Sequence, residues 1–169
     1  MLGADARLVN GLFFDKTPDA NWKVAWHQDL AISVKERMDV SGFGPWTLKA
    51  GVHHVQPPPA ILECMLALRI HLDDTNEANG ALKVIPGSHK LGRLTAVEIS
   101  LISHETAPVL CEAARGSVLA MRPLLLHASS AGSSPNRRRV IHLEFANCAL
   151  PGSLAWNQYS QCHSTPRNG

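Results

Sequence analysis

Short apolar runs recur along the whole chain, and each is bounded by residues that favour turns. Between the runs lie Pro57-Pro58-Pro59, Asn79-Gly80, Pro86-Gly87 and the stretch from Gly132 to Asn136. Several of the runs alternate between apolar and polar positions, as half-buried β-strands do. The candidate strands are Arg7–Phe14, Trp22–Asp29, Ala50–Gln56, Leu62–Leu72, Ala81–Ile85, Val109–Glu112, Ser117–Leu126 and Arg139–Ala146. Many short strands with turns between them predict an antiparallel sandwich or barrel.

Two stretches have a pattern that predicts a helix, Thr95–Ser103 and Ile32–Asp39. Neither is long enough to support an alternating α/β fold with a doubly wound sheet. The sequence from Pro151 onward is polar and rich in Ser, Asn and Gln, and we expect it to run over the surface. The chain is therefore expected to be mainly β, with few short helices.

The length and composition fit a single globular domain, which we take to span residues 1–169. Apolar residues make up 45% and charged residues 18% of the chain, and this balance argues against wholesale disorder. The net charge is only +2 with His neutral, and the one dense basic run is Arg137-Arg138-Arg139. Because a nucleic-acid-binding protein gathers many basic residues on one face, we expect no nucleic-acid partner.

The chain has no sign of a membrane or secretory segment. No apolar stretch approaches the roughly 18–20 residues that span a bilayer, so no membrane partner is expected. The start, from Met1 to Arg7, lacks a basic region followed by an apolar one, and we expect a cytoplasmic protein. In a reducing cytoplasm the four cysteines (Cys64, Cys111, Cys148 and Cys162) are expected to be free thiols.

The first candidate for chemistry is the segment His27-Gln28-Asp29. Residues two apart in a strand point to the same face, so His27 and Asp29 can place an imidazole and a carboxylate around one metal ion. A facial triad of two His and one carboxylate needs a second His and leaves open positions for oxygen and a co-substrate. His127, which follows the run Leu124-Leu125-Leu126, is the best candidate for that second His. His-x-Asp alone is a common pattern, so this interpretation needs further support.

That support lies in the basic run that follows His127 by about one strand. Arg138 comes eleven residues after His127, at the start of the next candidate strand. A buried Arg offers a two-pronged donor for a carboxylate, as the distal carboxylate of 2-oxoglutarate requires. Ser129 can add a hydroxyl donor at the same end. Strand alternation then predicts that Val140, His142 and Glu144 share the inner face with Arg138, whereas Ile141, Leu143 and Phe145 face outward.

Taken together, these segments resemble the phytanoyl-CoA dioxygenase-like family. The resemblance rests on His27-Gln28-Asp29, on Asp73-Asp74 leading to Asn79–His89, on His127-Ala128-Ser129 and on Arg138, and it covers roughly Trp22 to Ala146. It implies a double-stranded β-helix (a jelly roll, cupin-like) of about residues 22–146 that uses Fe(II), 2-oxoglutarate and O2. By the same resemblance His27, Asp29 and His127 hold the iron, while Arg138 and Ser129 hold the C5 carboxylate of 2-oxoglutarate. The expected function is hydroxylation of a small-molecule substrate, with release of succinate and CO2.

The chain departs from the family pattern at its N-terminal end. Members usually carry a longer, mainly helical region before the His-x-Asp strand, and here only 26 residues precede His27. Either the chain is a minimal version, or a partner or a second copy covers the exposed sheet face of Ile141, Leu143 and Phe145.

A second departure is Arg69, where many members carry an aromatic residue. Arg69 and His71 share one face of a candidate strand. If that face points inward, they can bind an acidic group of the substrate or the C1 end of 2-oxoglutarate. The alternative is a pair at a sheet edge that makes ordinary hydrogen bonds. Trp46 can line the mouth of a substrate site, although aromatic residues more often pack in a core.

Two other functions remain open. A metal-dependent hydrolase or isomerase on a jelly roll can use the same His-x-Asp and His ligands with zinc, but no general base is apparent and Arg138 then has no assigned purpose. A non-catalytic binding module of the same fold is the other, and the intact triad argues against it. The sequence does not identify the substrate.

Overall fold

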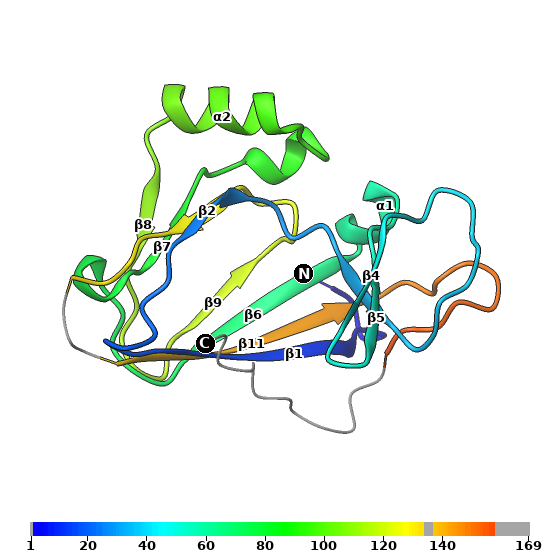
Figure 1. The fold of residues 1–169 in the computed structure, drawn as a ribbon, viewed down its shortest axis with the longest axis horizontal. Coiled ribbons are helices and arrows are strands. Elements are labelled where there is room, and N and C mark those ends of the chain that lie inside the picture. Colours follow the sequence, from blue (N-terminus) through cyan, green and yellow to red (C-terminus); the bar gives the residue numbers. More distant parts are fainter. Residues whose placement is uncertain (1, 134–136, 158–169) are drawn as a thin grey trace.

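The computed structural model describes residues 2–133 and 137–157 and consists mainly of strands (Figure 1). Two α-helices are present in this part of the chain, α1 (Pro59–Glu63) and α2 (Ala96–Glu105), together with 3-10 turns at Glu77–Asn79 and Ser88–Leu91. The strands are β1 (Arg7–Lys16), β2 (Val24–His27), β3 (Ile32–Val34), β4 (Trp46–Lys49), β5 (Val52–Val55), β6 (Met65–His71), β7 (Leu82–Val84), β8 (Val109–Cys111), β9 (Val118–Met121), β10 (His127–Ser129) and β11 (Arg138–Ala146).

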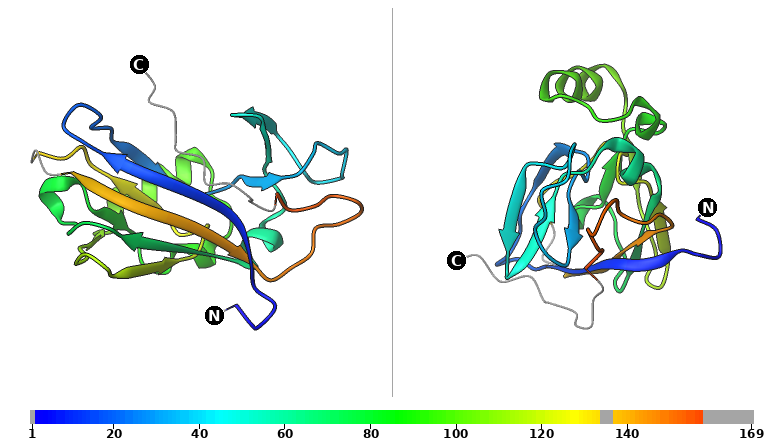
Figure 2. Two further views of the ribbon diagram at one scale, coloured as in Figure 1. Left: turned by 90° about the horizontal axis from the view of Figure 1, so that it is seen from below. Right: turned by 90° about the vertical axis from the view of Figure 1, so that its right-hand side faces the viewer.

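Two antiparallel sheets of four strands form the body of the molecule (Figures 1 and 2). The major sheet has the order β1-β11-β6-β9 and the minor sheet the order β2-β10-β7-β8. Consecutive strands such as β1 and β2, β6 and β7, or β10 and β11 therefore lie in opposite sheets. This winding is a double-stranded β-helix and confirms the expected fold class. A small third sheet, β3-β5-β4, is inserted between β2 and β6.

The strand β11 shows how the sequence pattern sets the two faces of the major sheet. Its burial alternates strictly, with Arg138, Val140, His142, Glu144 and Ala146 buried and the residues between them half-buried. The expected inward position of Arg138 is thereby confirmed. The inner face of β11 is unusual because three of its five side chains are polar, and buried polar groups need partners or a ligand.

The expected helix over Ile32–Asp39 is wrong. Ile32, Ser33 and Val34 are all buried and form β3, which pairs with β5. Ile and Val are β-branched and fit a pleated surface better than a helix. The spacing of apolar residues alone did not distinguish the two, because the partner strand lies some twenty positions further along the chain.

Several strand boundaries also differ from those expected. The run Ser117–Leu126 is not one strand: β9 ends at Met121, and His127 begins β10 instead of ending a strand. Pro123 interrupts the run because it has no N–H to donate to a ladder. The strand β4 was missed, and it is joined to β5 by a tight turn in which Ala50 and Gly51 have positive φ.

The helix α2 begins where the sequence predicts. Thr95 and Glu98 form a reciprocal cap, in which the Glu98 carboxylate accepts from the Thr95 N–H at 2.7 Å. Ile99 and Ile102 of α2 pack against a buried cluster that includes Leu126 of the minor-sheet region. No helix in residues 2–133 and 137–157 is long and apolar enough to cross a membrane.

The outer face of the major sheet is apolar, and no helix of the described chain lies over it (Figure 2, left). The directly paired residues Phe145 and Leu66, Leu143 and Leu68, and Ile141 and Ile70 share this face. All of these side chains are half-buried, and the flanking residues Leu8 and Val118 are 40% and 54% exposed. We call this surface the outer face; it comprises Leu8, Phe13, Leu66, Leu68, Ile70, Val118, Ile141, Leu143 and Phe145.

The cysteines agree with the expectation as far as the structure describes them. Cys64, Cys111 and Cys148 are free and partly buried. Cys162 lies outside the described residues. Cys64 follows α1 directly and Cys111 ends β8, so both lie at or beside strands as expected.

The alternation along β11 leads to a stability prediction. Val140 has no exposed surface, whereas its neighbour Ile141 is half-buried on the outer face. We expect Val140→Ala to lower the free energy of unfolding by about 2 kcal/mol, through lost burial and a residual cavity. Ile141→Ala should cost about 1 kcal/mol or less. Urea unfolding measures both losses. A larger loss for Ile141→Ala than for Val140→Ala would mean that Ile141, and not Val140, faces the core.

Candidate metal centre

Three side chains from β2, the loop after it and β10 meet at one point. In the antiparallel pairing of β2 with β10, His27 lies directly opposite His127. Asp29 contributes from just beyond β2, with its Oδ1 at 3.5 Å from His27 Nε2 and its Oδ2 at 3.7 Å from His127 Nε2. One ligand atom from each of the three residues lies within 4.8 Å of the others, close enough to share a metal ion. The structure thus brings together the three residues that the sequence singled out.

Both imidazoles are held in the orientation that metal binding requires. His27 Nδ1 lies 2.9 Å from the carbonyl oxygen of Ala25, and His127 Nδ1 lies 2.8 Å from that of Leu125. A carbonyl oxygen can only accept, so each Nδ1 carries the proton and donates it. Each Nε2 then faces Asp29 and is the nitrogen that can coordinate a metal ion once it is free of a proton, and such Nδ1 hydrogen bonds are typical of metal-ligating His residues.

The charge states also suit a cation. Burial opposes ionisation of Asp29, but the hydrogen bond from His27 and the nearby His residues lower its pKa to about 2. Burial lowers the pKa of His127 to about 4. For His27 burial acts in the same direction, yet the hydrogen bond and charge of Asp29 raise its pKa above the ordinary value. At neutral pH the centre therefore offers an ionised carboxylate and a neutral imidazole, His127, without rearrangement.

The triad is open on one side and closed on the other. The side chain of His127 is 5% exposed, whereas those of His27 and Asp29 are 38% and 30% exposed. Three protein ligands on one side of an ion leave positions for other ligands on the accessible side. The donor set and its exposure therefore fit Fe(II) or another divalent transition metal.

Gln28 supports the triad from behind, and the sequence did not single it out as a functional residue. Its side chain is buried and donates to the carbonyl oxygens of Gly92 and Leu124, both at 2.8 Å. Its carbonyl oxygen accepts from the Leu94 N–H at 2.8 Å. These three bonds tie the His27–Asp29 segment to two other loops. In the sequence, only the position of Gln28 between His27 and Asp29 indicated this role.

Arg138, Ser129 and a residue the sequence analysis missed, Lys16, lie at another part of the barrel interior. Arg138 is buried, and its Nε has no hydrogen-bond partner among the described residues. Lys16 is buried opposite Arg138 in the β1–β11 pairing and donates to the carbonyl oxygen of Ser130 at 2.8 Å. Burial and the charge of Arg138 lower the pKa of Lys16 to about 8. Ser129 is buried two residues after His127, on the same side of β10.

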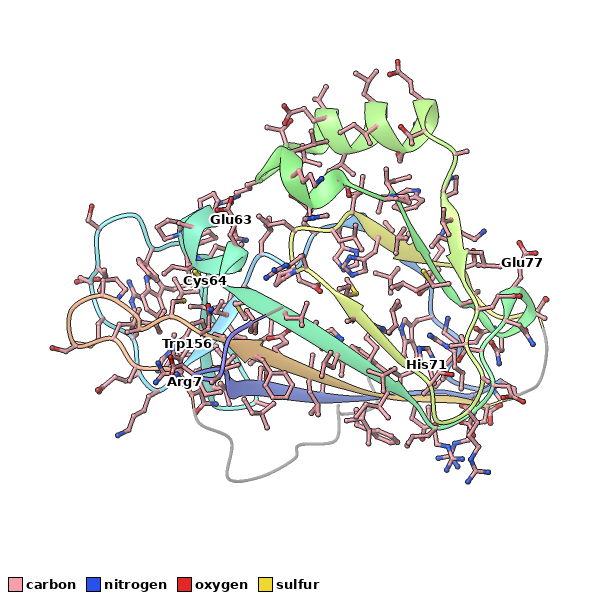
Figure 3. The ribbon with its side chains drawn as sticks, turned by 180° about the vertical axis from the view of Figure 1, so that it is seen from behind. Arg7, Glu63, Cys64, His71, Glu77 and Trp156 are labelled. Carbon is pink, nitrogen blue, oxygen red and sulfur yellow. The ribbon has the colours of Figure 1, made fainter. Side chains whose placement is uncertain are left out.

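Arg69 and His71 lie on the inner face of β6, as one of the two sequence hypotheses required. Both are buried, and Arg69 Nη1 donates to His142 Nδ1 at 3.1 Å. Figure 3 shows His71 at the end of β6, on the side that faces the minor sheet. Its Nδ1 is 2.8 Å from the Thr75 hydroxyl, while its Nε2 has no partner among the described residues. Burial lowers the pKa of His71, and the charges of Arg69 and Arg138 lower it further.

Trp46 occupies a different place from the triad. It lies in β4 and packs against the core cluster that includes Val34, Val55 and Leu62. The guanidinium carbon of Arg37 lies 5.8 Å from the centre of its ring. These contacts favour a packing role, and a contact between Trp46 and substrate stays a prediction.

The position of Gln28 leads to a testable expectation. Gln28→Ala leaves one buried N–H and two carbonyl oxygens without their side-chain partner, so we expect a loss of about 3 kcal/mol in unfolding free energy. Because the segment carries two candidate ligands, metal affinity should also fall by roughly tenfold or more. Gln28→Met, which keeps the volume, is the control, and urea unfolding and Co(II) titration are the measurements. A Gln28→Met protein as stable as the unsubstituted chain would contradict a role for the hydrogen bonds.

Comparison with solved structures finds the same fold in longer proteins. EvdMO1 superimposes with a TM-score of 0.63 at 26% identity, over 88% of this chain and 29% of its own. AviO1 from Streptomyces viridochromogenes Tue57 gives 0.60 at 24% identity, over 87% of this chain and 53% of its own. EctD from S. alaskensis, solved with 2-oxoglutarate and 5-hydroxyectoine, gives 0.61 at 17% identity, over 86% and 45%. The chain thus spans about a third to a half of these proteins.

The family is decided by the sequence itself. No curated protein has a significant match to the chain. The family model described as Phytanoyl-CoA dioxygenase (PhyH) matches residues 5–140, which is most of the chain and contains all three triad residues and Arg138. Enzymes of that family use Fe(II), 2-oxoglutarate and O2. The chain belongs to the phytanoyl-CoA dioxygenase (PhyH) family.

Proposed function

We propose that this chain is the jelly-roll domain of an Fe(II)- and 2-oxoglutarate-dependent oxygenase that hydroxylates a small molecule, with release of succinate and CO2. The observation that carries the proposal is the convergence of two preset imidazoles and an ionised carboxylate within 4.8 Å of one another. Family membership supports the same cofactor set.

In this proposal His27, Asp29 and His127 hold the iron, and Arg138 holds the C5 carboxylate of 2-oxoglutarate with help from the Ser129 hydroxyl. Bound iron supplies the activation of oxygen, which no side chain can perform. The protein residues bind and orient. Arg138 offers a buried planar fork, and a carboxylate bound at a buried guanidinium is held more strongly than one at the surface.

The outcome of the oxidation depends on the substrate as well as on the triad. Two structures of the same fold are those of the carbocyclase SnoK and the epimerase SnoN from nogalamycin biosynthesis, at 14% and 17% identity to this chain. Hydroxylation is the simplest outcome and is the one we propose. Product analysis by mass spectrometry distinguishes it, since hydroxylation adds one oxygen atom to the substrate.

A metal-dependent hydrolase or isomerase has less support. In the part of the chain that the structure describes, the two interior carboxylates are engaged, Asp29 with the two imidazoles and Glu144 with Asn10 and His142. Neither is therefore free to act as a general base, and Arg138 would have no ligand to bind. A binding module without turnover would keep the metal but show no oxygen-dependent formation of succinate.

The proposal is tested by binding and turnover together. Without oxygen, Fe(II) and 2-oxoglutarate added to the chain should give a weak visible absorption band, and oxygen should then yield succinate. His27→Ala should abolish both. Arg138→Ala should weaken 2-oxoglutarate binding by roughly 10- to 100-fold, because one buried charge-assisted contact is lost.

Arg137→Ala is the matched control for Arg138→Ala. Arg137 is the exposed neighbour and pairs with Asp15, at 2.7 and 2.6 Å. Its removal should leave 2-oxoglutarate binding unchanged. An effect of Arg137→Ala without one of Arg138→Ala would contradict the assigned site, and absence of the band in the unsubstituted chain would contradict the proposed function.

We also propose that the outer face is an interface with a second copy of the chain. A contiguous apolar surface across four strands is larger than isolated exposed side chains, and such surfaces mark contact sites. Sheet faces of this kind bury well against one another.

Self-association through the outer face can be measured directly. Leu143 lies near its centre, so Leu143→Glu should shift an associated chain toward the monomer in sedimentation equilibrium. Leu101→Glu, on the exposed side of α2, is the control because Leu101 is already 57% exposed. A chain that is monomeric at the highest concentration and unchanged by Leu143→Glu would contradict self-association.

A further inference from the structure

A chain of buried polar side chains crosses the inner face of the major sheet. Asn10 Nδ2 donates to Glu144 Oε2 at 3.0 Å, and Glu144 Oε1 lies 3.3 Å from His142 Nε2. His142 Nδ1 lies 3.1 Å from Arg69 Nη1. These four residues, from β1, β11 and β6, are at most 7% exposed. We call them the relay.

The direction of every bond in the relay is determined. Asn10 Oδ1 accepts from the Gly11 N–H at 3.0 Å, so its Nδ2 is the end that faces Glu144. A guanidinium can only donate, so His142 Nδ1 is an acceptor and its proton sits on Nε2. His142 therefore donates to the Glu144 carboxylate. The relay fixes one edge of the Arg69 guanidinium and leaves its Nε without a partner.

Arg69 thus carries a buried charge with which no acidic side chain of the described residues forms an ion pair. The ion pairs of the described residues include neither Arg69 nor Arg138, and the Nε of each lacks an acceptor. Burial and the charge of Arg138 lower the pKa of Arg69 to about 10, so it stays charged at neutral pH. A buried cation without an acid partner is costly, and the cost is offset when an anion binds.

The location of Arg69 indicates which anion it can bind. Arg69 is buried on the inner face of the major sheet, the face that also bears Arg138 and that lies opposite the minor sheet with its triad. The charges of Arg138 and Asp29 both act on it. 2-Oxoglutarate is a dianion with one carboxylate at each end. Two buried arginines on the inner face of one sheet match its two carboxylates one to one.

We propose that Arg69 binds the C1 carboxylate of 2-oxoglutarate beside the metal, and that His142 and Glu144 hold its guanidinium in place for this contact. The inference rests on the proposed function, because it assumes that 2-oxoglutarate binds at this centre. It adds a second anchor at the end of the co-substrate opposite to Arg138. Arg69 is a binding residue, whereas His142 and Glu144 act through it as positioning residues.

The test compares two keto acids that share the C1 end. Pyruvate has the keto group and one carboxylate, and it lacks the distal carboxylate of 2-oxoglutarate. In oxygen-free titrations of the Fe(II)-loaded chain, Arg69→Met should weaken both keto acids by roughly 10- to 100-fold. Arg138→Met should weaken 2-oxoglutarate alone. Arg137→Met, which removes the same charge at the surface, should change neither.

Glu144→Gln tests the positioning role and also covers a failure of Arg69→Met to fold. It keeps Arg69 and the side-chain volume but disrupts the relay, and it should weaken both keto acids by about 3- to 10-fold. Circular dichroism spectra should show that both variants fold, and Mn(II) affinity, measured without a keto acid, should be nearly unchanged in both. Arg69→Lys keeps the charge but lacks the planar fork. It should weaken both keto acids by an amount between the effects of Glu144→Gln and Arg69→Met.

The possible failures are distinguishable. If Arg69→Met folds, holds metal and binds both keto acids as well as the unsubstituted chain, Arg69 has no such role. If it weakens 2-oxoglutarate but not pyruvate, Arg69 acts at the distal carboxylate and the assignment to C1 is wrong. If the unsubstituted chain binds metal but neither keto acid, the proposed function itself fails.

Discussion

The antiparallel pairing of β2 with β10 places His27 directly opposite His127, and the whole candidate site depends on that register. A slip by one residue would turn one imidazole to the other face of the minor sheet and separate the two ligands. Gln28 and the Asp29 N–H, which donates to the Pro123 carbonyl oxygen at 2.9 Å, hold the segment after β2 against the loop before β10. The pairing is therefore fixed from both sides of the triad.

The barrel interior has a clear division of charge. Asp29 lies among imidazoles at one place, while Arg69, Arg138 and Lys16 are buried on the major sheet, where Glu144 is the one buried carboxylate of the described residues. Glu144 is already bonded to Asn10 and His142. An interior with more buried cations than acids is unstable by itself, and it is suited to a cation at Asp29 and a dianion across the arginines. The same arrangement would be hard to explain by packing alone.

Much of the fold and of the triad could be predicted because the signals are local. His27 and Asp29 are two residues apart, the alternation of β11 is visible in its own sequence, and α2 carries its own cap. The relay could not be predicted, since Asn10 and Glu144 are 134 positions apart and meet only through the register of β1 with β11. Lys16 was missed for the same reason. The mistaken helix at β3 shows the limit of periodicity in short segments, where the partner strand decides the conformation.

The central claim is that two imidazoles and one carboxylate of this chain share a metal ion. X-ray absorption at the iron edge of the Fe(II)-loaded chain tests it most directly, because imidazole rings give a distinct scattering pattern. The account predicts two imidazole ligands, with oxygen atoms at all other positions, and the loss of one imidazole in His127→Ala. Fewer than two imidazoles in the unsubstituted chain, or a sulfur ligand from one of its thiols, would contradict it.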